Sequence, residues 1–132
     1  MKYSFLFWII TATSVIGACK PKCTSAGGGT GGTGSISVSP THGDSYFDSC
    51  TIYIKYGTLD TPPNGVYDDS QKCVMIDTVP VATFHNLKPG LYYFMGKGYH
   101  PVYHIYLIGA ATYTMCQEHA AYVDLPTDQY IP

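Results

Sequence analysis

Apolar and polar side chains alternate along several short stretches of this chain, a pattern typical of β-strands with one buried face. The clearest stretch is Cys50–Tyr56, in which Ile52 and Ile54 share one face. Residues 73–85 predict two strands, or one strand bent at Pro80, because proline cannot donate to a central ladder. The other expected strands are Ser35–Pro40, Leu91–Lys97, Pro101–Ile108, Tyr113–Cys116 and Ala120–Leu125.

These short strands, with turn residues between them and no convincing helix, predict an all-β fold. About seven of them in one domain indicate a seven-stranded Greek-key β-sandwich. We expect Pro40 and Pro126 to end their strands, residues 57–72 to form a long loop, and residues 109–111 to form a turn. The side chains expected to point inward in the first and last strands are Ile36, Val38, Val123 and Leu125.

The stretch Phe84–Gly98 organises the rest, since it predicts a strand, a tight Pro89-Gly90 turn and an aromatic strand. Proline fixes φ in such a turn, and glycine accepts positive φ without a Cβ clash. Tyr92 follows the turn in the pattern L-x-P-G-x-Y. We expect a tyrosine corner there, in which the ring is buried and the hydroxyl bonds to backbone upstream.

The segment Asp77–Tyr99 resembles the central motif of transthyretin-like and carboxypeptidase-regulatory-like domains. The resemblance implies a Greek-key β-sandwich of the transthyretin-like or immunoglobulin-like type. Such domains serve as spacers, stalks and accessory modules, so it implies little about function. The positions that match the motif are Phe84, Leu87, Pro89, Gly90, Tyr92, Gly98 and Tyr99.

Residues 1–18 have the form of a signal peptide, with Lys2 before an apolar run too short for a membrane span. The run ends in Ile16-Gly17-Ala18-Cys19, which resembles a bacterial lipobox. That resemblance implies cleavage before Cys19, a diacylglycerol on its thiol and a further acyl chain, such as palmitate, on its amine. The alternative is ordinary secretory cleavage, with Cys19 in a disulfide.

The number of cysteines favours lipidation, because five is an odd number in an exported chain. If Cys19 carries lipid, the remaining four form an even set with three possible connectivities. We favour Cys50–Cys73 together with Cys23–Cys116, since these bonds would hold the long loop and tie the N-terminal segment to a late strand. The oxidising compartment and the absence of a C-x-x-C pair argue against metal binding by these cysteines.

The chain therefore divides into a signal peptide (1–18), a lipidated cysteine with a glycine-rich tether (19–34) and a β-sandwich domain (35–132). Six of the eight residues 27–34 are glycine, and no G-K-[ST] follows, so a flexible linker is favoured over a phosphate-binding loop. Lys20 follows Cys19 where an aspartate would resemble an inner-membrane retention signal. We expect the outer membrane, with the periplasmic face favoured over the cell surface.

Charge argues against nucleic acid as a partner. Six lysines and nine acidic residues remain after the leader, so the mature net charge is 6 − 9 = −3, and the chain has no arginine. Phosphate recognition usually relies on a basic face and on the bidentate fork of arginine.

Candidate catalytic and metal-binding groups do not form a recognisable constellation. His100 and His104 would lie about 13 Å apart on one strand, too far for one ion. The acidic residues between Asp60 and Asp69 lack calcium-loop spacing. Ser45 and Ser49 lack a G-x-S-x-G elbow, and Glu118 is the single glutamate. We expect no enzymatic activity, no metal and no cofactor.

Two hypotheses of function remain. The first is a non-enzymatic, lipid-anchored accessory or structural subunit that docks on an outer-membrane complex. The second is a carbohydrate- or peptide-binding module that uses exposed tyrosines. A lesser possibility is pairing of a partner strand with Ser35–Pro40 as a free edge. The tyrosines proposed for binding are Tyr53, Tyr67, Tyr99 and Tyr103.

Overall fold

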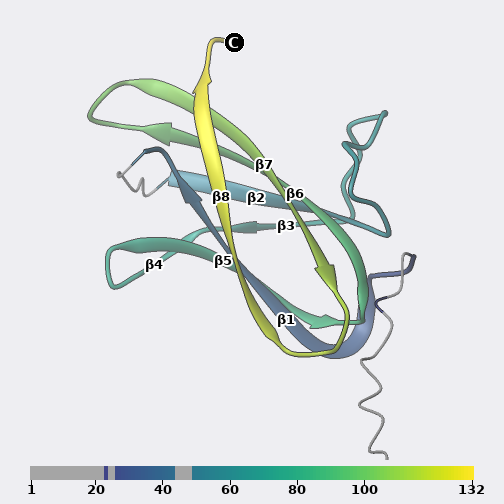
Figure 1. Cartoon of the computed structure of the whole chain (residues 1–132). Helices are drawn as coiled ribbons and strands as arrows, with labels where there is room; N and C mark the ends of the chain where they lie inside the picture. Colours follow the sequence, from purple (N-terminus) through teal and green to yellow (C-terminus); the bar gives the residue numbers. More distant parts are fainter. Residues whose placement is uncertain (1–22, 24–25, 44–48) are drawn as a thin grey trace, which may run out of the picture.

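The structure, a computed structural model, describes Cys23, residues 26–43 and residues 49–132. This part of the chain contains β-strands and no helix, so the all-β prediction is confirmed. The expected signal peptide and the lipidation of Cys19 lie outside the described residues. The strands, shown in Figure 1, are β1 (Thr30–Thr41), β2 (Ser49–Tyr56), β3 (Asp69–Lys72), β4 (Val74–Ile76), β5 (Val79–Leu87), β6 (Gly90–His100), β7 (Ile105–Met115) and β8 (Ala120–Tyr130).

The strands form one hydrogen-bonded sheet in the order β3-β2-β6-β7-β8-β1-β5-β4. The sheet curls until it nearly closes into a barrel (Figure 1). The sheet has two halves, β3-β2-β6-β7 and β8-β1-β5-β4. β8 links them because residues 120–126 pair in parallel with β1, whereas residues 127–130 pair with β7. On the other side, the two edge strands β3 and β4 are separated in the chain by Cys73 alone. β1 lies between β8 and β5, so the predicted free edge at Ser35–Pro40 is wrong.

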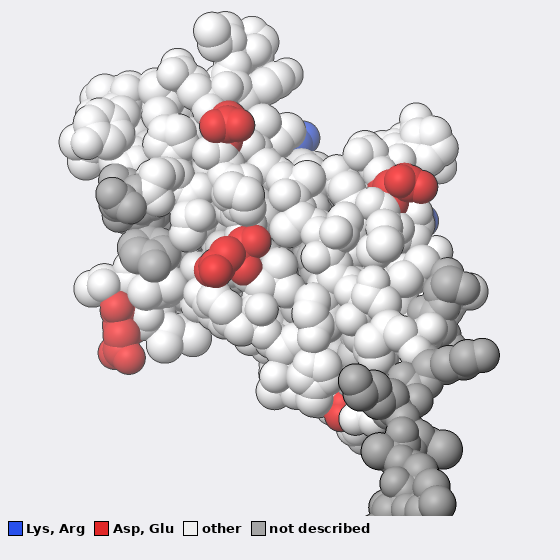
Figure 2. All heavy atoms as spheres, in the orientation of Figure 1, with Lys and Arg blue, Asp and Glu red and all other residues white. Residues whose placement is uncertain are grey.

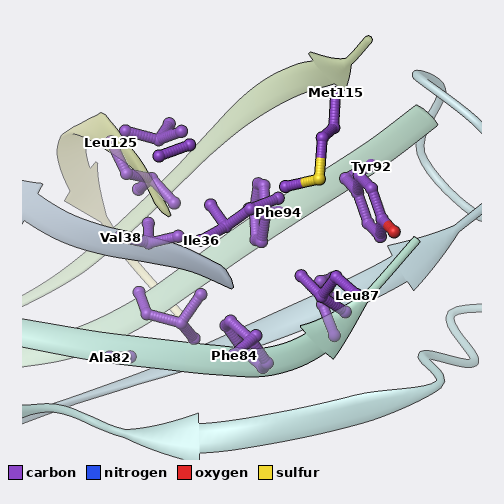
Figure 3. Packing of buried hydrophobic residues seen from close by; sticks show 13 residues of the cluster. Ile36, Val38, Ala82, Phe84, Leu87, Tyr92, Phe94, Met115 and Leu125 are labelled. Atoms are coloured by element: carbon purple, nitrogen blue, oxygen red, sulfur yellow. The ribbon is translucent and has the colours of Figure 1, made fainter. Parts of the chain in front are cut away.

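The core fills the space between the two halves of the curled sheet (Figure 3). Ile52 and Ile54 are fully buried, as their alternation predicts. Phe84 and Phe94 come from opposite halves, and their ring centroids lie 5.9 Å apart. The inward positions predicted for the first and last strands are also buried, namely Ile36, Val38, Val123 and Leu125.

Tyr92 forms the predicted tyrosine corner. Its ring is fully buried, and its hydroxyl bonds to the carbonyl of Lys88, four residues upstream. The same oxygen accepts the N–H of Gly29 at 3.0 Å. The corner therefore joins the turn before β6 to a segment 63 residues earlier in the chain.

The glycine-rich segment packs against this corner, which corrects the predicted tether boundary at Gly34. β1 begins at Thr30, and the carbonyl of Gly27 already accepts the N–H of Leu91 at 2.9 Å. A Cβ on Gly90 would lie 2.1 Å from the nitrogen of Gly28. Glycine is needed here because the two backbone segments lie too close together for any side chain. From composition alone, glycines that allow close packing cannot be distinguished from glycines that make a linker flexible.

Four other expected boundaries differ from the structure. β7 runs straight through the expected turn at residues 109–111, because Gly109 allows the backbone of Pro126 to approach. Pro126 lies inside β8, where that strand changes its pairing partner, and does not end it. Pro40 likewise lies within β1, and the end of the expected 57–72 loop forms β3.

Residues 73–85 form two strands, which resolves the alternative left open by Pro80. The turn between them uses Asp77 and Thr78, both at positive φ (49° and 68°). Pro80 lies in β5 opposite Met75, so proline is accommodated near the start of the strand. With β3 counted separately, the described part of the chain has eight strands where about seven were expected.

Both favoured disulfides are present, Cys23–Cys116 and Cys50–Cys73. Their sequence separations are 93 and 23 residues. On the chain-entropy model, closing loops of these lengths is worth about 4.7 and about 3.4 kcal/mol. Cys73 lies at the junction of β3 and β4, and its N–H donates to the carbonyl of Cys50 at 3.0 Å. The Cys50–Cys73 disulfide therefore stabilises the side of the barrel where the edge strands β3 and β4 lie, opposite β8.

The close packing of the glycine segment predicts that Gly32→Ala destabilises the fold. Its Cβ would lie 2.2 Å from the carbonyl oxygen of Leu87, so backbone must shift at a cost of about 1–3 kcal/mol. Thr30→Ala, at an exposed neighbouring position, should change the free energy of unfolding by no more than about 0.5 kcal/mol. Denaturant unfolding with both disulfides intact measures the difference. Equal stability of the two variants would restore the tether interpretation.

Tyr92→Phe should lower the free energy of unfolding by about 1–3 kcal/mol, because buried backbone groups lose a partner. Burial raises the pKa of Tyr92 above its ordinary value of 10.0. The neutral form of Tyr92 is thus favoured in the folded state. Its contribution to the free energy of unfolding is complete below pH 10 and is lost as the pH rises through the pKa of the folded state. Alkaline unfolding should be less steep in Tyr92→Phe than in the exposed control Tyr122→Phe. Identical profiles would contradict this role.

Candidate binding surface

The outer face of β2, β6 and β7 carries the side chains that alternate with the core. Register places Thr51 opposite Lys97 and Lys97 opposite Ile108, so these three form one row across the sheet. In the next row, Ser49, Tyr99 and Tyr106 lie side by side. This face is the part of the described surface where aromatic and basic side chains come together.

Three adjoining hollows on this face meet at Lys97, and together we call them the Lys97 groove. Their volumes are about 370, 450 and 480 Å³. Tyr106 separates the first two, and Ile108 is shared by the second and third. The other side chains that line the groove and matter below are Lys72, Met95, Tyr99, Tyr67 and Tyr130.

Tyrosines form one wall of the groove. The rings of Tyr99 and Tyr106 lie 5.1 Å apart at an angle of 53°. The hydroxyl of Tyr99 is hydrogen-bonded to Nδ1 of His104 at 3.0 Å, which orients its ring. Tyr106 is 53% exposed, and register places Tyr130, which is 50% exposed, beside it. These two rings offer apolar faces to a partner without a change in the fold.

The loop that follows β2 forms the opposite wall. Thr61 donates to the hydroxyl of Tyr93 at 2.9 Å, so the loop folds over the outer face and buries that ring. Asp68 fixes the end of the loop by accepting the N–H of Tyr56 at 2.7 Å and by pairing with Lys55 at 3.3 Å. The oxygen atoms of this acidic residue are thus engaged with the chain itself.

Tyr53 and Tyr67 pack together beside this wall, with ring centroids 5.5 Å apart. Tyr67 borders the groove, and Tyr53 lines a neighbouring hollow of about 380 Å³. Burial, followed by the nearby Tyr93, raises the pKa of Tyr67. Its hydroxyl therefore stays protonated at neutral pH and can donate a hydrogen bond to a partner.

The structure brings together three of the four tyrosines predicted for binding. Tyr53, Tyr67 and Tyr99 lie along or beside the groove, whereas Tyr103 lies apart and packs on His100, with ring centroids 4.5 Å apart. A binding role for any of them stays a prediction.

Sequence reasoning missed Lys97, Tyr106 and Tyr130. The alternation of Tyr106, Ile108 and Ala110 was the available signal for Tyr106. It was obscured because a turn was expected at residues 109–111, so the opposition of Tyr106 to Tyr99 went unnoticed. No comparable signal placed Tyr130, because Pro126 was expected to end the last strand, whereas β8 continues to Tyr130.

The charged side chains that line the groove are lysines, although the register places Asp128 opposite Ile108 in the same row. Lys97 and Lys72 line the same hollow, and within the described ranges the only ion pair is that between Lys55 and Asp68. The face seen in Figure 2 differs, because acidic side chains are scattered over it and lysines appear only at its margin. The groove thus fits a partner with carboxylate or carbonyl oxygens near its aromatic portion.

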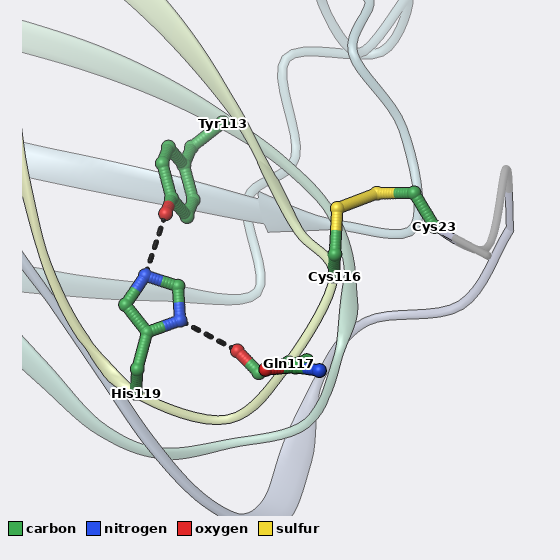
Figure 4. Close-up of a disulfide and its surroundings, with 5 residues drawn as sticks. All are labelled: Cys23, Tyr113, Cys116, Gln117 and His119. Atoms are coloured by element: carbon green, nitrogen blue, oxygen red, sulfur yellow. Dashed lines mark hydrogen bonds between the residues drawn. A yellow bond between two sulfur atoms is a disulfide. The ribbon is translucent and has the colours of Figure 1, made fainter. Parts of the chain in front are cut away.

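Both ring nitrogens of His119, in the β7–β8 turn, are hydrogen-bonded to nearby residues. His119 Nδ1 lies 2.6 Å from the carbonyl of Gln117, which can only accept, so Nδ1 carries the proton. Nε2 then accepts the hydroxyl of Tyr113 at 2.8 Å, beside the Cys23–Cys116 bond (Figure 4). In the described residues, no three His, Cys, Asp or Glu side chains come together as a possible metal site.

Comparison with family models, curated proteins and solved structures gave no match to this chain. Over the residues that the structure describes, no helix is long and apolar enough to cross a membrane.

Proposed function

We propose that this chain is a non-enzymatic protein of a bacterial cell envelope, anchored by lipid on Cys19, that acts as an accessory or structural subunit of an envelope complex. The observation that carries the proposal is the use of its cysteines. Two disulfides take up four of the five, and Cys19 is the fifth. Its place directly after Ile16-Gly17-Ala18, at the end of the leader, fits acylation better than a third bond.

The fold is proposed to be a Greek-key sandwich of the transthyretin-like class. The sheet order divides into β3-β2-β6-β7 and β8-β1-β5-β4, and the core lies between these halves. β2 and β6 are neighbours although the intervening chain visits the other half, as a Greek-key connection requires. The tyrosine corner at Tyr92 adds support. If β3 and β4 are counted as one strand interrupted at Cys73, the strands number seven.

The outer membrane, and its periplasmic face in preference to the cell surface, remains the proposed location. It depends on Lys20, which stands directly after Cys19 in place of an aspartate. Two or three acyl chains would hold the protein stably, whereas one would hold it only marginally.

Docking on a protein partner is assigned to the Lys97 groove. Exposed tyrosines are typical of the residues that contribute most to protein interfaces, and Lys97 can pair with a carboxylate of the partner. Tyr106 and Tyr130 are half exposed yet held within strands, so their ordering on binding costs little entropy.

The second candidate is a carbohydrate- or peptide-binding module. The tilted Tyr99–Tyr106 pair favours it, since an aromatic face can stack on a sugar ring or on a peptide. Retention on glycan columns without a protein partner would select this candidate over the first.

Lipidation predicts that Cys19→Ala moves the protein from the membrane fraction to the soluble fraction. Mass spectrometry of the wild-type N-terminal peptide should find an acylated cysteine. A variant with both Cys23→Ser and Cys116→Ser is the control, and it should remain in the membrane fraction because it keeps the acylated residue. An unmodified thiol at Cys19 in membrane-extracted protein would exclude lipidation.

Docking predicts that Lys97→Ala combined with Tyr106→Ala weakens partner retention at least about tenfold. The measurement is pull-down of detergent-extracted protein, with the partner quantified against the bait. Tyr122→Ala removes an equally exposed tyrosine outside the groove and should retain the partner in full. Equal retention by both variants would rule out the groove as the docking site.

A further inference from the structure

The Cys23–Cys116 disulfide ties the N-terminal segment to one end of the barrel. Cys116 directly follows β7, at the tip of the turn between β7 and β8. Its Cα lies 4.4 Å from that of Cys23 (Figure 4). The turn before β6 lies at the same end, because Gly90 is opposite Met115 in the sheet. Lys88, in that turn, is exposed.

This bond shortens the chain between the proposed lipid and the barrel. Cys23 is four residues after Cys19, a distance of at most about 13–14 Å when fully extended. Without the bond, the first backbone hydrogen bond to the body within the described residues is at Gly27, eight residues after Cys19. The maximum reach would then be about 26–29 Å. The disulfide thus halves the distance by which the body can leave a membrane.

We propose that the end of the barrel formed by the β5–β6 and β7–β8 turns rests on the lipid surface, held there by the Cys23–Cys116 bond. The occupant of this surface is the layer of lipid headgroups, in which the acyl chains of Cys19 are anchored. The inference rests on the lipidation proposed above. It adds an orientation that lipidation alone does not give, since an unrestrained tether allows any side of the body to face the membrane.

Basic residues close to the proposed anchor in the sequence suit anionic headgroups. The sequence places Lys20 and Lys22 between the lipidated cysteine and the disulfide, and Lys88 is exposed in the neighbouring turn. Glu118 is the acidic residue of the β7–β8 turn, and it accepts a hydrogen bond from Thr33 at 2.5 Å. In the two turns that the structure describes at this end, Lys88 is balanced by Glu118, and Lys20 and Lys22 lie outside the described residues but close to the proposed anchor in the sequence. Basic residues beside an anchor contribute about 1 kcal/mol each near an anionic surface.

The orientation places the Lys97 groove away from the lipid. β6 starts at the membrane end and runs for 11 residues, which spans about 33 Å at about 3.3 Å per residue. Lys97 would stand about 23 Å from that end. The β6–β7 connection with Tyr103 and the C-terminus lie at the far end, as Figure 1 shows for these segments. A docking partner would therefore meet the groove above the headgroups.

Tryptophan reporters can test this orientation, because the one tryptophan of the chain, Trp8, lies in the leader. Gln117→Trp marks the proposed membrane end, and Tyr103→Trp marks the far end. Each lipidated variant, from which the leader has been removed, is reconstituted in vesicles of phosphatidylethanolamine and phosphatidylglycerol containing a lipid with a nitroxide on its headgroup. The Gln117→Trp variant should lose most of its emission, whereas the Tyr103→Trp variant should keep most of it. Ala120→Trp, at another exposed position near the turn, replaces Gln117→Trp if that variant fails to form both disulfides.

Removal of the Cys23–Cys116 disulfide is the second part of the experiment. With Cys23→Ser and Cys116→Ser added to each reporter variant, the difference in quenching between the two ends should largely disappear. Flotation and N-terminal mass spectrometry of the same samples report lipidation separately. Acylated protein that floats but shows equal quenching at both ends would overturn the orientation and leave lipidation intact. A difference that persists without the disulfide would overturn the role of the bond. Protein without acylation would overturn the proposed anchoring itself.

Discussion

The hydroxyl group of Tyr92 is the point on which this structure depends. A single oxygen, buried at the end of the barrel, satisfies the carbonyl of Lys88 and the amide of Gly29. One contact fixes the turn before β6, and the other fixes the approach to β1. Because these strands belong to different halves of the curled sheet, the hydroxyl adds a link between the halves to those made by the ladders of β8 and by the Cys50–Cys73 bond.

The pattern L-x-P-G-x-Y predicted the tyrosine corner, and period-two alternation in the sequence was sufficient to predict the all-β class and the inward faces. It failed at glycine and proline, where one residue type serves opposite purposes. The glycines that precede Ser35 were interpreted as a linker, and Gly109 was interpreted as part of a turn. In the structure, both allow backbone segments to approach closely. Those contacts depend on residues distant in the chain, such as Pro126 beside Gly109. The groove was missed for the same reason, since Tyr130 reaches it only because β8 continues beyond Pro126.

Closure of the sheet leaves little free edge. β8 passes from one half to the other, and the segment containing β3 and β4 does the same on the opposite side, at Cys73. The edges that remain are strands of four and three residues. Short edges limit unwanted pairing between molecules. For a protein anchored at a surface, as proposed above, neighbouring copies would meet often, and short edges would leave specific contacts to side chains such as those of the Lys97 groove.

The parallel pairing of β1 with β8 has a consequence for biogenesis. Ser35, near the beginning of the body, pairs with Ala120, near its end. A chain that leaves a translocation pore from its N-terminus presents β1 long before its partner emerges. The central strand of one half therefore stays open on one side until the last strand has been exported, so the fold closes only after translocation is complete. Such late, non-local closure is slow, and in a chain exported as proposed it would leave time for chaperones and disulfide catalysts to act.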